Sequence, residues 1–255
     1  MGEQFINEIT DGPKRDFSIA SVIGLTLAAV SMIAAIMSGL GTKLNWWEFR
    51  TGFSILKWGA YGGFIAVLIS IVSLISSISG SRKSMFISIA ALFIGLIVFY
   101  IPFQWWRNAQ TLPPIHDITT DTENPPQFVK ILEVRKDAPN PPWYGGAEVS
   151  LKQKAAYPDI GPLILPYEPL DAYERALRAA GRMGWQIVDA DKKEGRIEAT
   201  DSTFWFGFKD DIIVRIKPSA TGSKIDVRST SRVGKSDIGT NADRIRTYLD
   251  LLRSS

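Results

Sequence analysis

The stretch Gly195–Gly234, GRIEATDSTFWFGFKDDIIVRIKPSATGSKIDVRSTSRVG, decides the fold of the second half of this chain. Apolar and polar residues alternate along it, and glycine or proline separates the runs, a pattern typical of strands joined by turns. It predicts three successive strands, over Arg196–Asp201, from about Phe204 to Lys217, and over Lys224–Gly234. We expect a bulge or bend at Asp210-Asp211, because adjacent carboxylates interrupt the alternation of the middle strand.

Two helices and one further strand are predicted on either side of this stretch. Apolar residues recur at helical spacing from Leu170 to Met183, after a proline suited to a first turn, and again from Ala242 to Leu252. Trp185–Val188 is predicted to be the first strand. The order helix, four strands, helix predicts an α+β domain over residues 169–255, with two helices packed on one face of a four-stranded antiparallel sheet.

The first part of the chain, residues 1–107, is a predicted membrane domain. Charged residues are absent from Phe17–Thr42, Trp58–Ser81 and Ser84–Trp106, and each stretch exceeds the roughly 20 residues that a helix needs to cross the hydrocarbon core. Glycine and serine in these stretches favour close helix packing in lipid. We expect three transmembrane helices, which lack the intramembrane charges typical of pumps and channels.

Residues 108–168 are predicted to form a proline-rich tether between the two parts. Its prolines predict that it contains no helix and makes a poor central strand, because proline lacks the backbone N–H donor. Hydrophobic residues are nevertheless placed along it, among them Phe128, Ile131 and Trp143. We therefore expect the tether to be extended, to wrap over the folded domain and to dock on it.

Charge and composition restrict the partners and the compartment. With 29 basic and 26 acidic residues spread along the chain, nucleic acid is not an expected partner. The absence of cysteine excludes disulfides and thiolate metal sites. Basic residues are balanced in number on the two sides of the predicted spans: Lys14, Arg15, Arg82 and Lys83 against Lys43, Arg50, Lys57 and Arg107. The first four form tight pairs against span ends, which favours a cytoplasmic N-terminus. Three spans then predict a periplasmic C-terminal domain, attached to a bacterial inner membrane.

The sheet face opposite the predicted helices carries candidate ligand-binding residues. Arg215, Arg228 and Arg232 would lie on it, and guanidinium groups suit phosphate and carboxylate ligands. A second interpretation leaves this face solvated, with cross-strand ion pairs such as Asp226 with Arg215.

Four carboxylates and the single histidine are the other candidates. His116 precedes Asp117 and lies near Asp121, which suggests a metal or acid–base site, although turn chemistry explains the same residues. No second histidine or cysteine joins His116, so neither zinc nor another cofactor is expected. Asp210 and Asp211 invite an acid–base role, but neighbours on a strand point to opposite faces. An ion pair with a nearby arginine is the alternative for them.

Five motifs occur in order along the second half: LPPIHDITTD (112–121), AYPDIGPL (156–163), MGW (183–185), RIEATDSTFWFGFKDDIIVRI (196–216) and DVRSTSRVGKSDIGTNADRIR (226–246). Together they resemble the family of domains of unknown function numbered 1499, over about Thr111–Leu252. The three spans resemble its membrane-attached members, and the export of other members implies a position outside the cytoplasm. The resemblance implies no activity, cofactor or catalytic residue. It selects His116-Asp117, Asp210-Asp211 and Arg228-Ser229 as the positions to test first.

These observations predict a non-catalytic protein of the cell envelope. Its domain would bind an anionic or amphipathic ligand, such as a lipid-like molecule, or a partner membrane protein, beside the bilayer that holds the spans. Two alternatives stay open: a hydrolase-type enzyme that uses His116 with Asp117, Asp121 or Asp210, and an accessory subunit of a larger membrane complex. Convergence of His116 with Asp210-Asp211 and Arg228 in one cleft would favour the enzyme.

Overall fold

The computed structural model describes residues 18–77 and 81–254 and divides into two compact units, Met1–Trp105 and Trp106–Ser255. Lys14 and Arg15, which carry part of the predicted orientation, lie outside the described residues. Three helices dominate the first unit, and each is long and apolar enough to cross a membrane: α2 (Ile19–Lys43), α3 (Phe49–Ser77) and α4 (Arg82–Thr111). The prediction of three candidate spans is therefore confirmed.

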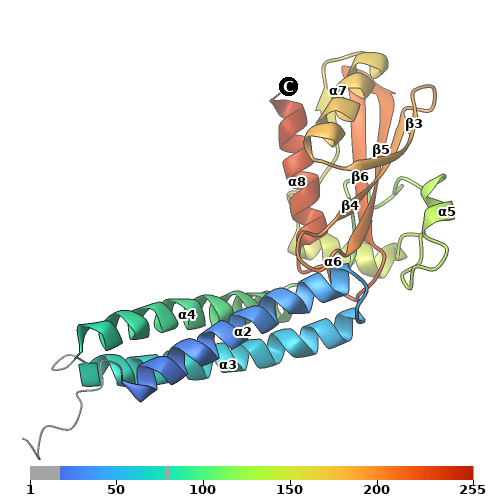
Figure 1. Ribbon diagram of the computed structural model, residues 1–255. Coiled ribbons are helices and arrows are strands. Elements are labelled where there is room, and N and C mark those ends of the chain that lie inside the picture. Colours follow the sequence, from blue (N-terminus) through green and yellow to red (C-terminus); the bar gives the residue numbers. More distant parts are fainter. Residues whose placement is uncertain (1–17, 78–80, 255) are drawn as a thin grey trace, which may run out of the picture. The chain divides into compact units, whose positions relative to one another are not determined.

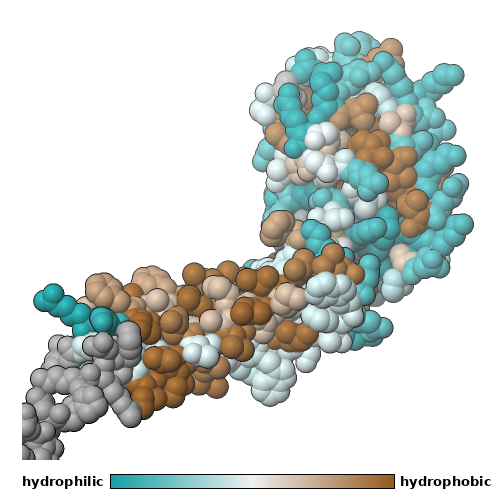
Figure 2. All heavy atoms as spheres, viewed as in Figure 1, coloured by the Kyte–Doolittle hydropathy of each residue, from teal (hydrophilic) through white to brown (hydrophobic). Residues whose placement is uncertain are grey.

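Small residues form the contacts among these helices. A Cβ added to Gly95 of α4 would lie 2.8 Å from the carbonyl oxygen of Gly63 in α3, and the Ser88 hydroxyl bonds the Ser73 hydroxyl at 2.9 Å. One alanine from each helix completes a buried cluster: Ala28, Ala66 and Ala91. Large apolar side chains face outward instead, and Figure 2 shows hydrophobic residues over most of the visible surface of α2–α4. This division is typical of helices that pack within lipid.

The second unit is built on an antiparallel sheet of six strands, not four. The strand order is β1-β6-β5-β4-β3, and β2 also pairs with β6. Their bounds are β1 (Asp117–Thr119), β2 (Leu163–Leu165), β3 (Gln186–Asp191), β4 (Arg196–Ser202), β5 (Lys209–Ser219) and β6 (Gly222–Ser231). The three strands predicted within Gly195–Gly234 and the strand before them are therefore present.

The two additional strands, β1 and β2, come from the proline-rich segment. They pair with successive parts of the same edge of β6, β1 with Arg228–Thr230 and β2 with Ser223–Ile225. Each has three residues, which is too short for hydrophobic alternation to reveal. Both lie at the edge of the sheet, where nearby prolines are tolerated, so they agree with the exclusion of central strands. The predicted exclusion of helices is wrong, because α5 (Ile131–Val134) and α6 (Gly146–Ala156) lie within the proline-rich segment.

The strand predicted from Phe204 begins later, at Lys209. Residues 203–208 form the connection between β4 and β5. The N–H of Gly207 donates to the Thr203 carbonyl at 3.0 Å, and the N–H of Phe208 donates to Thr203 Oγ1 at 2.9 Å. Gly207 has φ +68°, a left-handed conformation that glycine adopts without strain. Aromatic residues at alternate positions therefore gave this loop the period-2 pattern that is typical of a strand.

The predicted bulge at Asp210-Asp211 is also wrong. Both residues continue a regular register with β6, opposite Ser231 and Thr230. The irregularity in the sheet lies in β3 instead, between Ile187 and Asp189. Carboxylates fit the regular strand because arginines from other elements pair with them on each face of the sheet.

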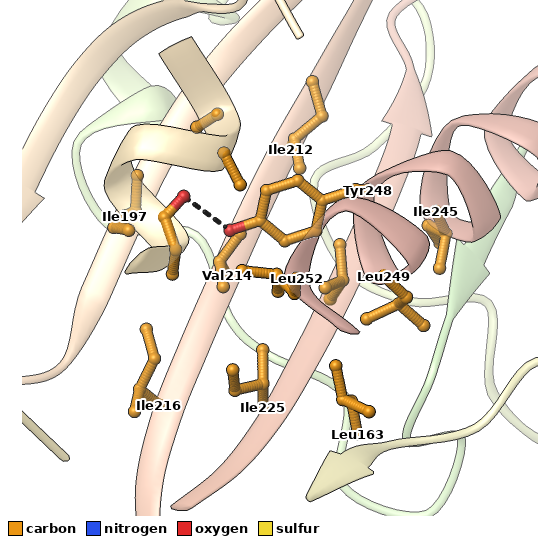
Figure 3. Packing of buried hydrophobic residues seen from close by; sticks show 14 of the residues in the cluster. Leu163, Ile197, Ile212, Val214, Ile216, Ile225, Ile245, Tyr248, Leu249 and Leu252 are labelled. Carbon is orange, nitrogen blue, oxygen red and sulfur yellow. Dashed lines mark hydrogen bonds between the residues drawn. The ribbon is translucent and has the colours of Figure 1, made fainter. Parts of the chain in front are cut away.

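Two helices cover one face of the sheet, as predicted. Figure 1 shows α7 (Pro169–Arg182) and α8 (Thr240–Arg253) on one side of the strands and the one-turn α5 (Ile131–Val134) on the other; α6 (Gly146–Ala156) precedes β2. Figure 3 shows apolar side chains from β4, β5, β6 and α8 meeting in the core. The Tyr248 hydroxyl donates to the Ala176 carbonyl at 2.8 Å, the dashed line in Figure 3. The Tyr248 ring also stacks on that of Trp185.

Candidate ligand-binding site

The sheet face opposite α7 and α8 is covered by the chain itself. Residues 121–145, which we call the strap, belong to the predicted tether, and Ile131 of the strap packs against Ile213 of β5. Glu198 of β4 is fully buried beneath the strap and accepts the backbone N–H groups of Val129 at 2.8 Å and Ile131 at 2.7 Å. The tether therefore docks on the domain, and polar contacts hold it on the charged face of the sheet.

Arg228 of β6 is the largest of the fully buried candidate residues. Its side chain is fully buried and forms two hydrogen bonds with the Asp117 carboxylate, at 2.9 and 2.7 Å. It also donates to the strap carbonyls of Pro126 at 3.1 Å and Pro142 at 2.8 Å, and its guanidinium lies 4.9 Å from the centre of the Phe128 ring. Pairing and hydrogen bonding are what make a buried charge tolerable. The donors of Arg228 are thus engaged within the protein.

Asp211 of β5 binds two guanidinium groups at once. Arg135 of the strap donates to it at 3.0 Å, Arg232 donates at 2.9 and 2.7 Å, and the Thr200 hydroxyl donates at 2.7 Å. Burial lowers the pKa of Arg135, while the charge of Asp211 acts in the opposite direction. This cluster fastens the strap to two strands of the sheet.

A third cluster lies where β5 and β6 meet the start of the strap. Arg215 contacts Asp226 at 2.7 Å and Asp121 at 3.1 Å, and Lys224 contacts Asp121 at 3.0 Å. The second interpretation of this face expected the ion pair of Asp226 with Arg215, but its expectation of a solvated face is wrong, because Asp226 and Arg228 are both fully buried. Burial alone would raise the pKa of Asp121, but the backbone N–H of Asn124, Lys224 and Arg215 outweigh it and hold that pKa below its usual value.

Asp210 and Ser229 lie on the opposite, helix-covered face. Arg244 of α8 donates to Asp210 at 2.7 Å and to Asp201 at 2.9 Å. The Ser229 hydroxyl donates to the side chain of Asn241 at 2.6 Å, and Arg244 contacts the same hydroxyl at 3.2 Å. Burial raises the pKa of Asp210, and Arg244 opposes the rise. Asp210 and Asp211 therefore point apart, and each binds arginine, as the alternative interpretation expected.

His116 connects to this second face through its main chain. Its carbonyl accepts the Asn241 side-chain amide at 3.0 Å and the N–H of Ser231 at 2.9 Å. Within residues 18–77 and 81–254, its imidazole forms no hydrogen bond or ion pair with Asp121, Asp210 or Asp211. The candidate residues thus divide into separate ion-paired groups on two faces of the sheet.

Several residues that build these clusters were not among the candidates: Arg135, Glu198, Asn241 and Arg244. The position of Glu198 could be predicted, because it alternates with the buried Ile197 and Ala199 and shares a face with Arg228 when the strands pair in register. Arg135 carried none, since its role depends on the path of the strap. In the described part of the chain, no group of three or more histidine or acidic side chains could hold a metal ion.

Comparison with known proteins adds one match. A family model described as a protein of unknown function, DUF1499, matches residues 117–252. The matched region starts at the first residue of β1 and ends within α8, so it contains the strap, the whole sheet and both covering helices. No match was found among the curated proteins. Because the family model covers more than half of the 255 residues, this chain belongs to the DUF1499 family of proteins of unknown function.

Proposed function

We propose that this protein is a non-catalytic envelope protein whose C-terminal domain, on the periplasmic side of a bacterial inner membrane, binds a partner membrane protein. The three candidate spans supply the anchor. Arg82 and Lys83 at the start of α4 supply the positive charge typical of a cytoplasmic turn. With that turn in the cytoplasm, the chain after α4 lies on the periplasmic side.

The observation that carries the proposal is the mutual pairing of the charged side chains around the sheet. An anion that used Arg228 would have to replace the Asp117 carboxylate and two strap carbonyls. Proton transfer by Asp210 or Asp121 would first have to break contacts with Arg244 or with Arg215. The paired charged side chains around the sheet, which we call the charged layer, therefore support a structural role. We assign partner binding to other surfaces of the domain.

The outer side of the strap is the surface that we assign to the partner. Val129, Leu132 and Val134 are exposed there, while Ile131 between them is buried against the sheet. Single exposed apolar residues are common, but several within one short segment are typical of protein contact surfaces. The charged layer beneath holds this segment in place, so the segment would lose little conformational entropy when the partner binds.

Site-specific photo-cross-linking in cells tests this assignment. A photoreactive residue at Leu132, whose side chain is 43% exposed, is expected to give a discrete cross-linked product with a second membrane protein. The matched control is the same residue at Leu151 of α6, an exposed leucine outside the strap, which should give none. The full-length variants Leu132→Asp and Val134→Asp should lose the partner during purification in mild detergent, whereas Leu151→Asp keeps it.

Three outcomes would contradict the proposal in different ways. Equal cross-linking at Leu132 and Leu151 would show that the partner does not bind specifically at the strap. A lone monomer with no bound protein or lipid would remove the binding function altogether. A bound lipid without a protein partner would support the amphipathic-ligand version of the function instead.

A further inference from the structure

One end of the sheet gathers three connecting segments. Asp117, the first residue of β1, pairs with Thr230 near the end of β6, and Asp210 near the start of β5 pairs with Ser231. The segments 112–116, 203–208 and 232–239 therefore leave the sheet on the same side. We call this side the loop end.

The segment 203–208 presents an aromatic side chain on a closed loop. Phe204 is 94% exposed. It belongs to the run Phe204–Phe208, in which four of the five residues are aromatic. Behind it, the rings of Phe206 and Phe208 are stacked with an interplanar angle of 4°, and Thr203 bonds both Gly207 and Phe208. The loop therefore holds its apolar tip outward in one conformation, which lowers the entropic cost of binding.

The segment 232–239 presents a second apolar residue in a strained backbone. Ile238 is exposed and has φ +53°, which is a genuine outlier for a β-branched residue. The Asp237 carboxylate accepts the N–H groups of Gly239 and Asn241, both at 2.9 Å, and so fixes the turn that contains it. Lys209 and Lys235 are exposed beside these two loops. The loop end thus combines outward apolar tips with positive charge.

We propose that the loop end docks on the bilayer that holds the spans, with Phe204 and Ile238 in the interfacial layer and the two lysines at the headgroups. The C-terminal unit begins at Trp106 within α4, and only Leu112–His116 separate that helix from β1. Five residues of extended chain reach about 17 Å, so the bilayer that holds α4 is within reach of this end. Aromatic and apolar side chains flanked by lysine suit the interface of an anionic membrane.

The bilayer explains these loops better than a protein partner does. The apolar tips project from separate loops on the side of the domain where the chain arrives from a candidate span, and lysines accompany both. A phenylalanine side chain can enter the boundary between headgroups and acyl chains while neighbouring lysines stay hydrated. This contact is independent of the partner assigned to the strap, so either proposal can fail alone.

Depth measurements on the full-length protein test the contact. The chain has no cysteine, so Phe204→Cys and Ile238→Cys can each carry one spin label in nanodiscs that contain anionic lipid. The matched control is Leu170→Cys, an apolar position 58% exposed at the start of α7, toward the other end of the sheet. We expect labels at 204 and 238 to be accessible to oxygen and shielded from a water-soluble nickel reagent, and the label at 170 to show the reverse.

The outcomes separate the possible environments. Equal access of the nickel reagent to positions 204 and 170 would place the loop in water and overturn the proposal. Shielding of position 204 from both oxygen and nickel would indicate a protein contact and overturn it as well. The double variant Lys209→Gln, Lys235→Gln should reduce the nickel shielding at 204, and an unchanged value would remove the electrostatic part of the proposal.

Discussion

Arg228 shows how single residues organise this domain. An arginine on a sheet face first suggests a ligand site. Arg228 instead binds Asp117 of β1 and, through the carbonyls of Pro126 and Pro142, two parts of the strap. A buried ion pair adds little net stability compared with an apolar replacement, but the loss of one member leaves an uncompensated charge. The residue therefore acts in holding the strap on the sheet.

The variant Arg228→Met is expected to destabilise the C-terminal domain by about 3–5 kcal/mol, because Asp117 stays buried without its partner. The matched control is Arg246→Met, which removes the half-exposed pair with Asp159 and should cost at most about 1 kcal/mol. Chemical denaturation of the full-length protein in detergent, followed by near-ultraviolet circular dichroism, measures both. Equal effects of the two substitutions would contradict a structural role for Arg228.

At the scale of elements, the contact between α3 and α4 depends on the absence of side chains. The carbonyl oxygen of Gly63 lies 2.8 Å from the position that a Cβ on Gly95 would take, too close for a side chain to be added without a shift of the backbone. Such close backbone approach is a common source of packing between helices in lipid, where burial of apolar surface offers little advantage. The outward residues of the same helices are large and apolar and have no comparable constraint.

Gly95→Leu is therefore expected to separate α3 from α4, whereas Phe93→Leu, on the exposed side of α4, is not. Ser73 and Ser88 supply the measurement, because their hydroxyl oxygens are 2.9 Å apart and the chain has no native cysteine. Ser73→Cys with Ser88→Cys should cross-link rapidly under mild oxidation. The rate should fall at least about tenfold with Gly95→Leu, given that a 1.4 kcal/mol change in the contact equilibrium already produces that factor. An unchanged rate would show that the helices do not need this glycine contact.

For the whole molecule, the decisive property is the side of the membrane on which the domain lies. A reporter that is active only in the periplasm should be active when fused after Ser255 and inactive when fused after Ser81, between the second and third candidate spans. The charges of Arg82 and Lys83 motivate this orientation. The opposite pattern of activity would reverse the proposed topology and place the domain in the cytoplasm.

Much of the architecture could be predicted because its signals are local or repetitive. Charge-free stretches longer than a bilayer is thick identify the candidate spans, and alternation identifies β3 to β6 over most of their length. Two signals misled the prediction: aromatic alternation extended β5 back to Phe204, and adjacent carboxylates suggested a bulge at Asp210-Asp211. Both were local patterns whose meaning depended on groups elsewhere in the chain, a turn closed by Thr203 and arginines on α8 and the strap.

Three candidate spans, a proline-rich docking segment, an antiparallel sheet with two helices and the family resemblance could all be read from composition, periodicity and motifs along the chain. The folded chain was needed to show that β1 and β2 complete the sheet, that the strap covers the arginines, and that Phe204 projects from a loop. These features depend on contacts distant in sequence, because ion pairs such as Arg228 with Asp117 join residues more than a hundred positions apart. No periodicity along the chain encodes which carboxylate will meet which guanidinium; the folded path of the strap does.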